Sequence, residues 1–547
     1  MPGVTYTRQV QFTPHGVVVM HVLTAPKPDG LWALRPVLSN GALTGRERVT
    51  EIQKDVSSSA TVAGVNGDFF AWNDGTPSGI LMQNHILQRP PHELRSSIGV
   101  DRSGRLQVQR VAFYGTWQGL GQRWPLTGLN QPPGTNGMSL FTPAWGPTTP
   151  ALPGAVEAIV PQFPPAVPGV ELAGNVIQVV RNGNTPIPAG GAVFVARGTQ
   201  ATRLLIDAPV LTRIAARLTL KPEWGDVLDA IGGGPVIVRG GAPVFRAFEA
   251  FTPSQISPRD PRTAVGQRRD GTVILLAVDG RQPGYSVGVS NFELAQALVR
   301  LGAVTGSALD SGGSTTMAFD GQLLNRPSDP GGERPVSEAL LVEYFGIYAP
   351  EPAVPVLSPN GDGFADRQTL AYKVVRPSYV TAKLIGPGGA TEALQDGDRP
   401  PGTYRISWAG TNGGGAVLPE GRWRWVVSAL DDQGERSSTE RAFSLNNTLG
   451  FLSVPSSIVV RKGRVNRLAA FTLAHPARIT ARVETATGVR MVTLVKARSR
   501  AAGAVTLKWN GRDARRRLVF RGRYRLRLRA ANAFGVSEIL RPFSVRR

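Results

Sequence analysis

Three aspartates in this sequence are placed where they could act as catalytic acids, bases or nucleophiles. Asp279 directly follows the apolar run Val273–Val278. Asp310 follows Ala303–Leu309 in the same way, and Asp68 lies in an earlier polar segment. Carboxyl groups act as acid, base or nucleophile when a glycosidic bond is hydrolysed. We therefore take Asp279, Asp310 and Asp68 as candidate catalytic residues, with Asp279 and Asp310 at the ends of neighbouring strands as the working pair.

Cationic and glycine-rich segments beside these acids could hold a phosphodiester. Guanidinium groups bind phosphate through charge-assisted hydrogen bonds, and glycines let the backbone approach phosphate oxygens closely. The same segments also have structural interpretations, since Asp-Gly after a strand forms turns and an arginine can serve in an ion pair. The candidate substrate-binding residues are Asn66, Arg262, Thr263, Arg281, Gly312, Gly313, Ser314 and Thr315.

A metal site is an alternative use of the three aspartates. Asp68, Asp279 and Asp310 could gather a hard divalent cation such as Ca²⁺ or Mg²⁺, which takes oxygen ligands. The chain has no cysteine and only five histidines, which argues against a zinc site of the usual kind. We assign no metal ligands and no required cofactor from the sequence.

Five segments taken in order resemble the phosphodiester glycosidase family over roughly residues 1–347. The resemblance implies a hydrolase acting on a sugar that is held through its anomeric carbon in a phosphodiester. The five segments are GVNGDFF (64–70), GGGPVIVRGG (232–241), PRTAVG (261–266), VDGR (278–281) and LDSGGSTTM (309–317).

The elements that must position these residues follow from periodicity and capping signals. Alternation in Thr5–Phe12 and the run Val17–Val22 predict a pair of strands. Ser290 with Glu293 forms a capping-box pattern that opens a helix between two buried strands. The dense proline and glycine between residues 134 and 168 favour irregular loops. We expect an α+β or α/β catalytic domain with a mixed β-sheet.

An internal repeat follows the proline-rich linker near residue 350. Trp408 and Trp509, like Gly421 and Gly522, fall 101 residues apart, so two copies of one domain are expected. Their length and short strands indicate immunoglobulin-like β-sandwiches, and SPNGDGFAD (358–366) resembles the opening of such a domain in the flagellar hook-capping protein. The expected domains are 1–349, 350–447 and 448–547.

Charge is concentrated in the last of these domains. Residues 448–547 carry 23 Lys and Arg against three acids, and so hold +20 of the formal net charge of +22. Arginines at alternate positions in RGRYRLRLR (521–529) would share one face of a strand and attract an anionic cell-wall polymer. A solvated charged face is an equal alternative. Few aromatic residues interleave with them, which disfavours nucleic acid.

The sequence shows neither a transmembrane run nor a signal peptide at its start, and we expect a secreted or cell-envelope protein whose export signal is not in the sequence as given. The predicted function is hydrolysis of a glycosyl phosphodiester in an envelope or extracellular glycopolymer. A non-catalytic carbohydrate-binding or polyanion-binding surface protein is the alternative, because a fold does not fix a function.

Overall fold

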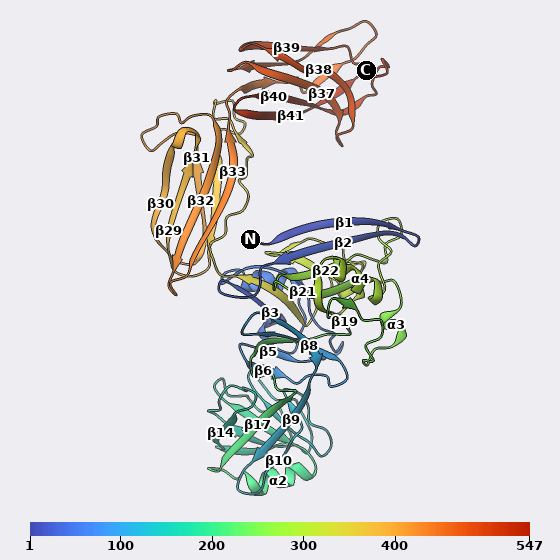
Figure 1. Ribbon diagram of the computed structural model, residues 1–547, viewed down its shortest axis with the longest axis vertical. Helices are drawn as coiled ribbons and strands as arrows, with labels where there is room; N and C mark the ends of the chain where they lie inside the picture. Colours follow the sequence, from blue (N-terminus) through green and yellow to red (C-terminus); the bar gives the residue numbers. More distant parts are fainter. The chain divides into compact units, whose positions relative to one another are not determined.

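The computed structural model describes residues 1–547, which form two compact units, Met1–Phe345 and Gly346–Arg547. Strands dominate both units, and each unit is described here by itself (Figure 1). The α-helices, all in the first unit, are α1 (Val49–Val56), α2 (Thr199–Asp207), α3 (Pro253–Ile256) and α4 (Asn291–Arg300). No helix is long and apolar enough to span a bilayer.

A seven-stranded sheet lies at one end of the first unit (Figure 1). The predicted N-terminal strand pair is its edge, and the predicted strand–helix–strand unit is present as β22, α4 and β23. In order across the sheet, the strands are β1 (Thr5–Thr13), β2 (Gly16–Ala25), β22 (Val273–Val278), β21 (Arg262–Arg268), β23 (Ala303–Ala308), β19 (Val236–Arg239) and β20 (Ala242–Pro243).

The sheet is antiparallel between all neighbours, and not mixed as expected. Strand β21 lies between β22 and β23, so these two strands are not neighbours. The prediction erred because a run buried on both faces is typical of parallel sheets. Here the residues of β22 alternate between two apolar layers: Ile274 and Leu276 pack with α4, whereas Leu275 and Ala277 pack against the next sheet.

Helix α4 begins and ends as predicted. The Ser290 hydroxyl accepts from the Glu293 backbone, and the Glu293 carboxylate accepts from the Ser290 backbone N–H at 2.9 Å. Gly302 follows the helix with φ +93°, a conformation that glycine adopts without steric cost.

Two further sheets pack beneath the seven-stranded sheet. In the first of them, β26 is paired with both β3 and β4, and α1 covers its far face through Val49 and Ile52. That sheet runs β25 (Gln322–Leu323), β24 (Met317–Phe319), β4 (Thr61–Asn66), β26 (Glu338–Tyr344) and β3 (Trp32–Leu38). The other runs β6 (Ile86–Arg89), β5 (Leu81–Gln83), β18 (Val227–Gly232), β7 (Ser96–Asp101) and β8 (Leu106–Arg110).

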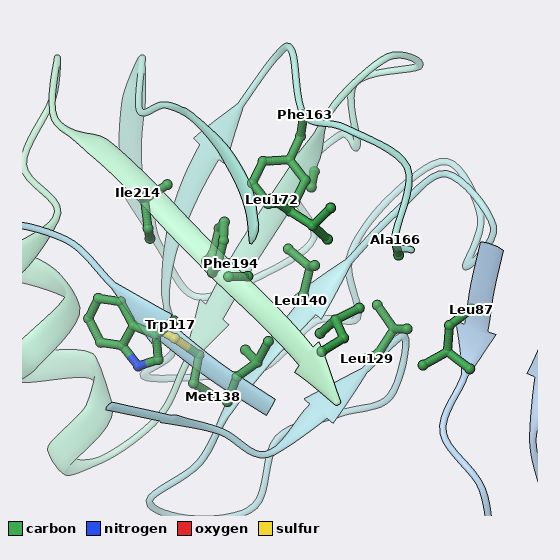
Figure 2. Close-up of a cluster of buried hydrophobic side chains, with 14 of the residues drawn as sticks. Leu87, Trp117, Leu129, Met138, Leu140, Phe163, Ala166, Leu172, Phe194 and Ile214 are labelled. Carbon is green, nitrogen blue, oxygen red and sulfur yellow. The ribbon is translucent and has the colours of Figure 1, made fainter. Parts of the chain in front are cut away.

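Residues 112–221 form two more sheets around a large apolar cluster (Figure 2). The expectation of irregular loops over residues 134–168 was only partly right, because two buried strands, β12 (Met138–Phe141) and β13 (Val156–Val160), lie among the turns there. One sheet is β10 (Trp124–Leu126), β9 (Ala112–Gln118), β17 (Arg213–Lys221) and β14 (Glu171–Asn175). The other is β11 (Gly128–Leu129), β12 (Met138–Phe141), β16 (Ala192–Ala196), β13 (Val156–Val160) and β15 (Gln178–Arg181).

The second unit contains two successive pairs of sheets. The first pair is β27 (Val356–Leu357), β33 (Arg436–Leu445), β32 (Gly421–Asp431), β29 (Ser378–Ile385) and β30 (Thr391–Arg399) with β28 (Gln368–Val374) and β31 (Gly402–Trp408). The second pair is β35 (Ser457–Val459), β41 (Gly535–Arg546), β40 (Gly522–Asn532), β37 (Ala477–Thr485) and β38 (Arg490–Arg500) with β34 (Leu449–Ser453), β36 (Asn466–Leu473) and β39 (Gly503–Trp509).

The 101-residue repeat recurs in the contacts of these sheets. The indole N–H of Trp408 donates to the backbone carbonyl three residues later at 2.8 Å, and that of Trp509 does the same at 3.0 Å. Trp423 and Tyr524 each donate to the carbonyl four residues earlier. Equivalent residues therefore hold equivalent loops in both copies.

Candidate active site

A cavity of about 350 Å³ in the first unit contains several of the predicted site residues. It lies where the loops after β4 and β23 meet, and aromatic, acidic and cationic side chains line it. The lining residues are Phe69, Phe70, Trp72, Ser254, Gln255, Asp260, Arg281, Asp310, Ser311, Gly312, Gly313 and Arg334. Of the candidates from the sequence, Asp310, Arg281, Gly312 and Gly313 thus face one space.

Asp310 is one of two carboxylates that line this cavity, and the other, Asp260, is paired with Arg281. The Asp310 backbone N–H donates to the carbonyl of Gly67 at 3.1 Å, which ties the loop after β23 to the loop after β4. One carboxylate oxygen accepts from the Ser311 backbone N–H at 2.8 Å. Desolvation by the surrounding protein raises the pKa of Asp310 to about 6, although a hydrogen bond from Ser314 opposes the shift. A carboxyl group with this pKa exchanges a proton near neutral pH.

Asp68 lies behind the cavity wall and is 2% exposed. Its Oδ2 accepts from the Gly79 backbone N–H at 2.6 Å, whereas its Oδ1 is buried without a partner. Burial raises the pKa of Asp68 to about 7, and the nearby charge of Asp310 adds to the rise. A Cβ on Gly232 would lie 2.1 Å from Asp68 Oδ2, so the glycine-rich segment makes room for this carboxyl group.

Glu338 is an acidic residue of the site that the sequence analysis missed. It is fully buried at the start of β26, and its Oε1 accepts from the Asp68 backbone N–H at 3.3 Å. Its Oε2 has no partner. Burial, followed by the charge of Asp68, raises the pKa of Glu338 well above its ordinary value. The available signal was a carboxylate at the beginning of a buried strand, whereas the acids predicted from the sequence follow strands.

Asn66 and Thr263 connect the elements that carry the acids. The Asn66 amide donates to the carbonyl of Asp310 at 2.9 Å, and its oxygen accepts from the Thr263 hydroxyl at 2.7 Å and from the Thr316 N–H at 3.1 Å. Both side chains are fully buried. Because their polar atoms are engaged with protein, these two residues hold the loops together and do not line the cavity.

Arg262 is also buried beneath the cavity, at 2% exposure. Its guanidinium donates to the carbonyls of Gln255, Pro258 and Val289, and to the Ser311 hydroxyl at 3.3 Å. Burial lowers the pKa of Arg262 to about 10. The predicted phosphate contact is replaced by a role in fixing the segment around α3 and the loop that carries Asp310.

Two other arginines line the cavity. Arg281, one of the predicted residues, donates to both oxygens of Asp260 at 2.8 and 3.1 Å. Arg334, which the sequence analysis missed, makes the same kind of pair with Asp329 at 2.8 and 3.0 Å. A Cβ on Gly313 would lie 2.0 Å from the Arg334 guanidinium, so a larger residue there would displace the Arg334–Asp329 pair.

Ser314 and Thr315 follow in the buried part of the same loop. The Ser314 hydroxyl accepts from Arg334 at 3.4 Å, and the Thr315 carbonyl accepts from the side chain of Asn325 at 3.0 Å. The Thr315 hydroxyl is buried without a partner. Ser314 is thus the last residue of the 3-10 turn Gly312–Ser314, and Thr315 supports this turn from behind.

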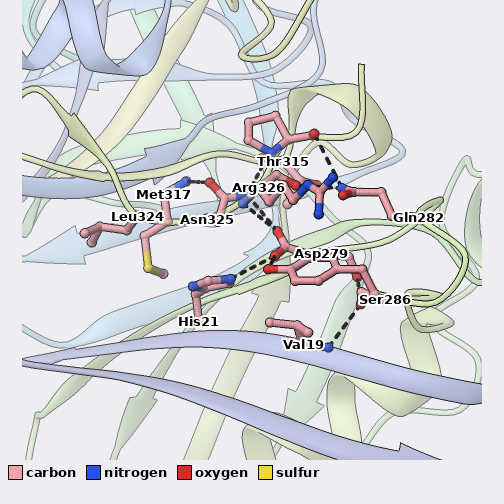
Figure 3. Close-up of polar contacts among 12 residues, drawn as sticks. Val19, His21, Asp279, Gln282, Ser286, Thr315, Met317, Leu324, Asn325 and Arg326 are labelled. Atoms are coloured by element: carbon pink, nitrogen blue, oxygen red, sulfur yellow. Dashed lines mark hydrogen bonds and ion pairs between the residues drawn. The ribbon is translucent and has the colours of Figure 1, made fainter. Parts of the chain in front are cut away.

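Asp279 lies in a separate buried cluster (Figure 3). Its Oδ2 contacts His21 Nε2 at 2.9 Å and accepts from the Tyr285 hydroxyl at 3.0 Å. Its Oδ1 accepts from the Asn325 side chain at 3.1 Å and from the Arg326 backbone N–H at 3.0 Å. Four partners occupy this carboxylate, and it does not line the cavity. The structure thus does not bring Asp279 to the cavity that Asp310 lines, and β22 and β23, which end at these two residues, are not neighbouring strands as expected.

The three aspartates do not converge as a metal site either. No group of three or more His, Asp or Glu side chains in residues 1–547 is arranged to hold a metal ion. The acids that do approach one another are Asp68, Glu338 and Asp310, through the contacts and mutual charge effects described above.

Comparison with known proteins agrees with the resemblance seen in the sequence. Residues 167–343, about a third of the chain, match the phosphodiester glycosidase family. The bovine (Bos taurus) N-acetylglucosamine-1-phosphodiester alpha-N-acetylglucosaminidase is 41% identical over 68 residues, which are 12% of each chain. An SPbeta prophage-derived uncharacterized protein of Bacillus subtilis (strain 168) is 34% identical over 99 residues, or 18% of this chain. The predicted family resemblance is confirmed for the matched segment.

The matches cover only part of each relative. The chain spans 15% of the length of the Bacillus protein and 12% of the bovine enzyme. A crystal structure of a hypothetical protein from Synechocystis has a TM-score of 0.53 and 27% identity, and the match covers 62% of each chain. This last likeness covers a larger share of the chain than the family-matched segment does.

Proposed function

We propose, on the premise that residues 167–343 form a phosphodiester glycosidase domain, that the first unit hydrolyses a glycosyl phosphodiester at the cavity around Asp310. One observation carries the proposal: a carboxyl group with a pKa of about 6 lines a cavity that also holds two arginines and a glycine turn. Such a site supplies both an ionisable carboxyl group for the anomeric centre and cations for the phosphate.

Asp310 and Asp68 have different places in this proposal. Asp310 lines the cavity with a pKa of about 6, so it is the carboxyl group that meets the sugar and exchanges a proton near neutral pH. Asp68, with a pKa of about 7, lies behind the cavity wall, where its charge interacts with that of Asp310. Arg281 and Arg334 hold the phosphate, each oriented by its own carboxylate partner.

The test is the hydrolysis of a panel of α- and β-linked sugar-1-phosphodiesters by the full chain and by Asp310→Asn. We expect the variant to lose at least about a hundredfold in kcat while it still binds the sugar. Asp279→Asn serves as the matched control, because that carboxylate lies outside the cavity and should affect stability more than chemistry. Sugar binding without turnover by the wild-type protein would instead favour the carbohydrate-binding alternative.

The last pair of sheets supports a proposed location at an anionic polymer of the cell envelope. On β40, Tyr524, Leu526 and Leu528 are buried while Arg523 and Arg529 are exposed, so the arginines share the outer face of the strand. Salt-sensitive retention of the protein on a polyanionic glycopolymer would support this role. Equal retention on DNA at the same salt concentration would contradict a preference for the glycopolymer.

A further inference from the structure

A second cavity, of about 610 Å³, adjoins the candidate active site. The two cavities share the lining residues Trp72 and Arg334, so they lie side by side. Trp72 is 64% exposed, although it is among the largest apolar side chains. The lining residues of this second cavity are Gly45, Arg46, Trp72, Asn73, Asp74, Arg334 and Pro335.

The loop that carries Trp72 is held in one conformation. The Ala71 N–H donates to the Thr76 carbonyl at 2.9 Å, and the Gly75 N–H donates to the Ala71 carbonyl at 2.8 Å. The segment at Gly45 also holds the loop, because the Gly45 N–H donates to the Asp74 carbonyl at 2.7 Å. Gly75 has φ +81°, and a Cβ there would lie 2.2 Å from the Gly45 carbonyl oxygen. The exposed indole is therefore a preorganised surface, which reduces the entropy lost on binding.

Two guanidinium groups lie beside the indole, and only one of them is paired with a carboxylate. Those of Arg46 and Arg334 are 5.5 and 5.3 Å from its ring centroid. Arg334 is held in a pair with Asp329 and also lines the first cavity, whereas Arg46 makes no ion pair in the structure, is exposed and lines only the second cavity. Asp74 also lines the cavity, but one of its oxygens already accepts from the Thr76 backbone and hydroxyl. Arg46 is thus the cation of the second cavity that is available for a further anionic group.

We propose that this second cavity binds the next sugar of an anionic glycan chain, with the sugar ring against Trp72 and a phosphate or carboxylate substituent at Arg46. An aromatic ring offers an apolar face to the C–H groups of a sugar, and a cation near it attracts the anionic substituent. The inference rests on the proposed function and specifies its substrate as an anionic oligosaccharide rather than a glycosyl phosphodiester with a small alcohol.

The test is a calorimetric titration of the full chain with three oligosaccharides that share one backbone: neutral, phosphorylated and carboxylated. Trp72→Ala should weaken binding of all three about tenfold, because each sugar ring loses the apolar face of the indole. Arg46→Gln should weaken only the anionic ligands, and the one that loses more identifies the anion. Tyr114→Ala is the matched control, because Tyr114 is an aromatic residue with a similar exposure of 59% on another sheet.

Unchanged affinity of Trp72→Ala for every oligosaccharide would overturn the proposal, and equal losses of neutral and anionic ligands in Arg46→Gln would overturn the assignment of Arg46. Tighter binding of an oligonucleotide, abolished in Trp72→Ala, would also overturn it. The titration requires no turnover. Binding that depends on Trp72, in a protein that hydrolyses no phosphodiester, would support this site and refute the proposed function.

Discussion

Replacement of Asp68 by asparagine should change how stability depends on pH. The pKa of Asp68 is about 7 in the folded protein against an ordinary value of 3.8. Between these values the folded state holds a proton that the unfolded state has released, so the free energy of unfolding falls as pH rises towards 7. The difference corresponds to at most about 4 kcal/mol. Asparagine has no proton to lose and can still accept from the Gly79 N–H.

The measurement is the free energy of unfolding of the full chain in urea, from about pH 5 to about pH 8, for wild type and Asp68→Asn. The variant should gain stability relative to wild type across this range, by about 3 kcal/mol, because about two of the three pKa units lie between pH 5 and pH 7. Asp270→Asn is the control: the Thr272 N–H and hydroxyl lower the pKa of this exposed aspartate, so it stays ionised throughout and its effect should be constant. A constant difference between wild type and Asp68→Asn would refute the reasoning.

Three other substitutions test separate parts of the structure. Asp279→Ala leaves its buried donors without an acceptor and should cost about 3–5 kcal/mol, measured as a lower Tm of the first unit. Gly313→Ala places a methyl group 2.0 Å from the Arg334 guanidinium and should raise KM for a sugar phosphodiester with little change in secondary structure by circular dichroism. Glu484→Gln frees two arginines of the outer face of β40 and should shift elution from a polyanionic resin to higher salt.

Local signals in the sequence predicted the elements well. The Ser290 capping box, the apolar run of β22 and the repeat that relates Trp408 to Trp509 each depend on residues close in the chain or on a constant spacing. The strands of residues 134–168 were missed because their apolar residues lie among prolines and glycines. In that region burial in a shared core outweighs the local turn propensities.

The site was only partly predictable, because its acids meet across long separations. Asp68 and Glu338 are 270 residues apart in the chain, and no spacing rule brings them together. The pattern of an apolar run followed by an aspartate is shared by Asp310, which faces a cavity, and Asp279, which has four hydrogen-bond partners. The difference depends on which residues of other strands surround it, and a single sequence does not contain that pairing.

The position of β26 between β3 and β4 also determines when this unit can form during synthesis. The two flanking strands leave the ribosome early, but their shared partner starts at Glu338 and is among the last parts of the unit to emerge. Until then β4 lacks a neighbour on one side, and its edge is open to wrong pairing. A fragment restricted to the family-matched residues 167–343 would lack both flanking strands. Completion of the active site is therefore tied to completion of the chain through residue 344.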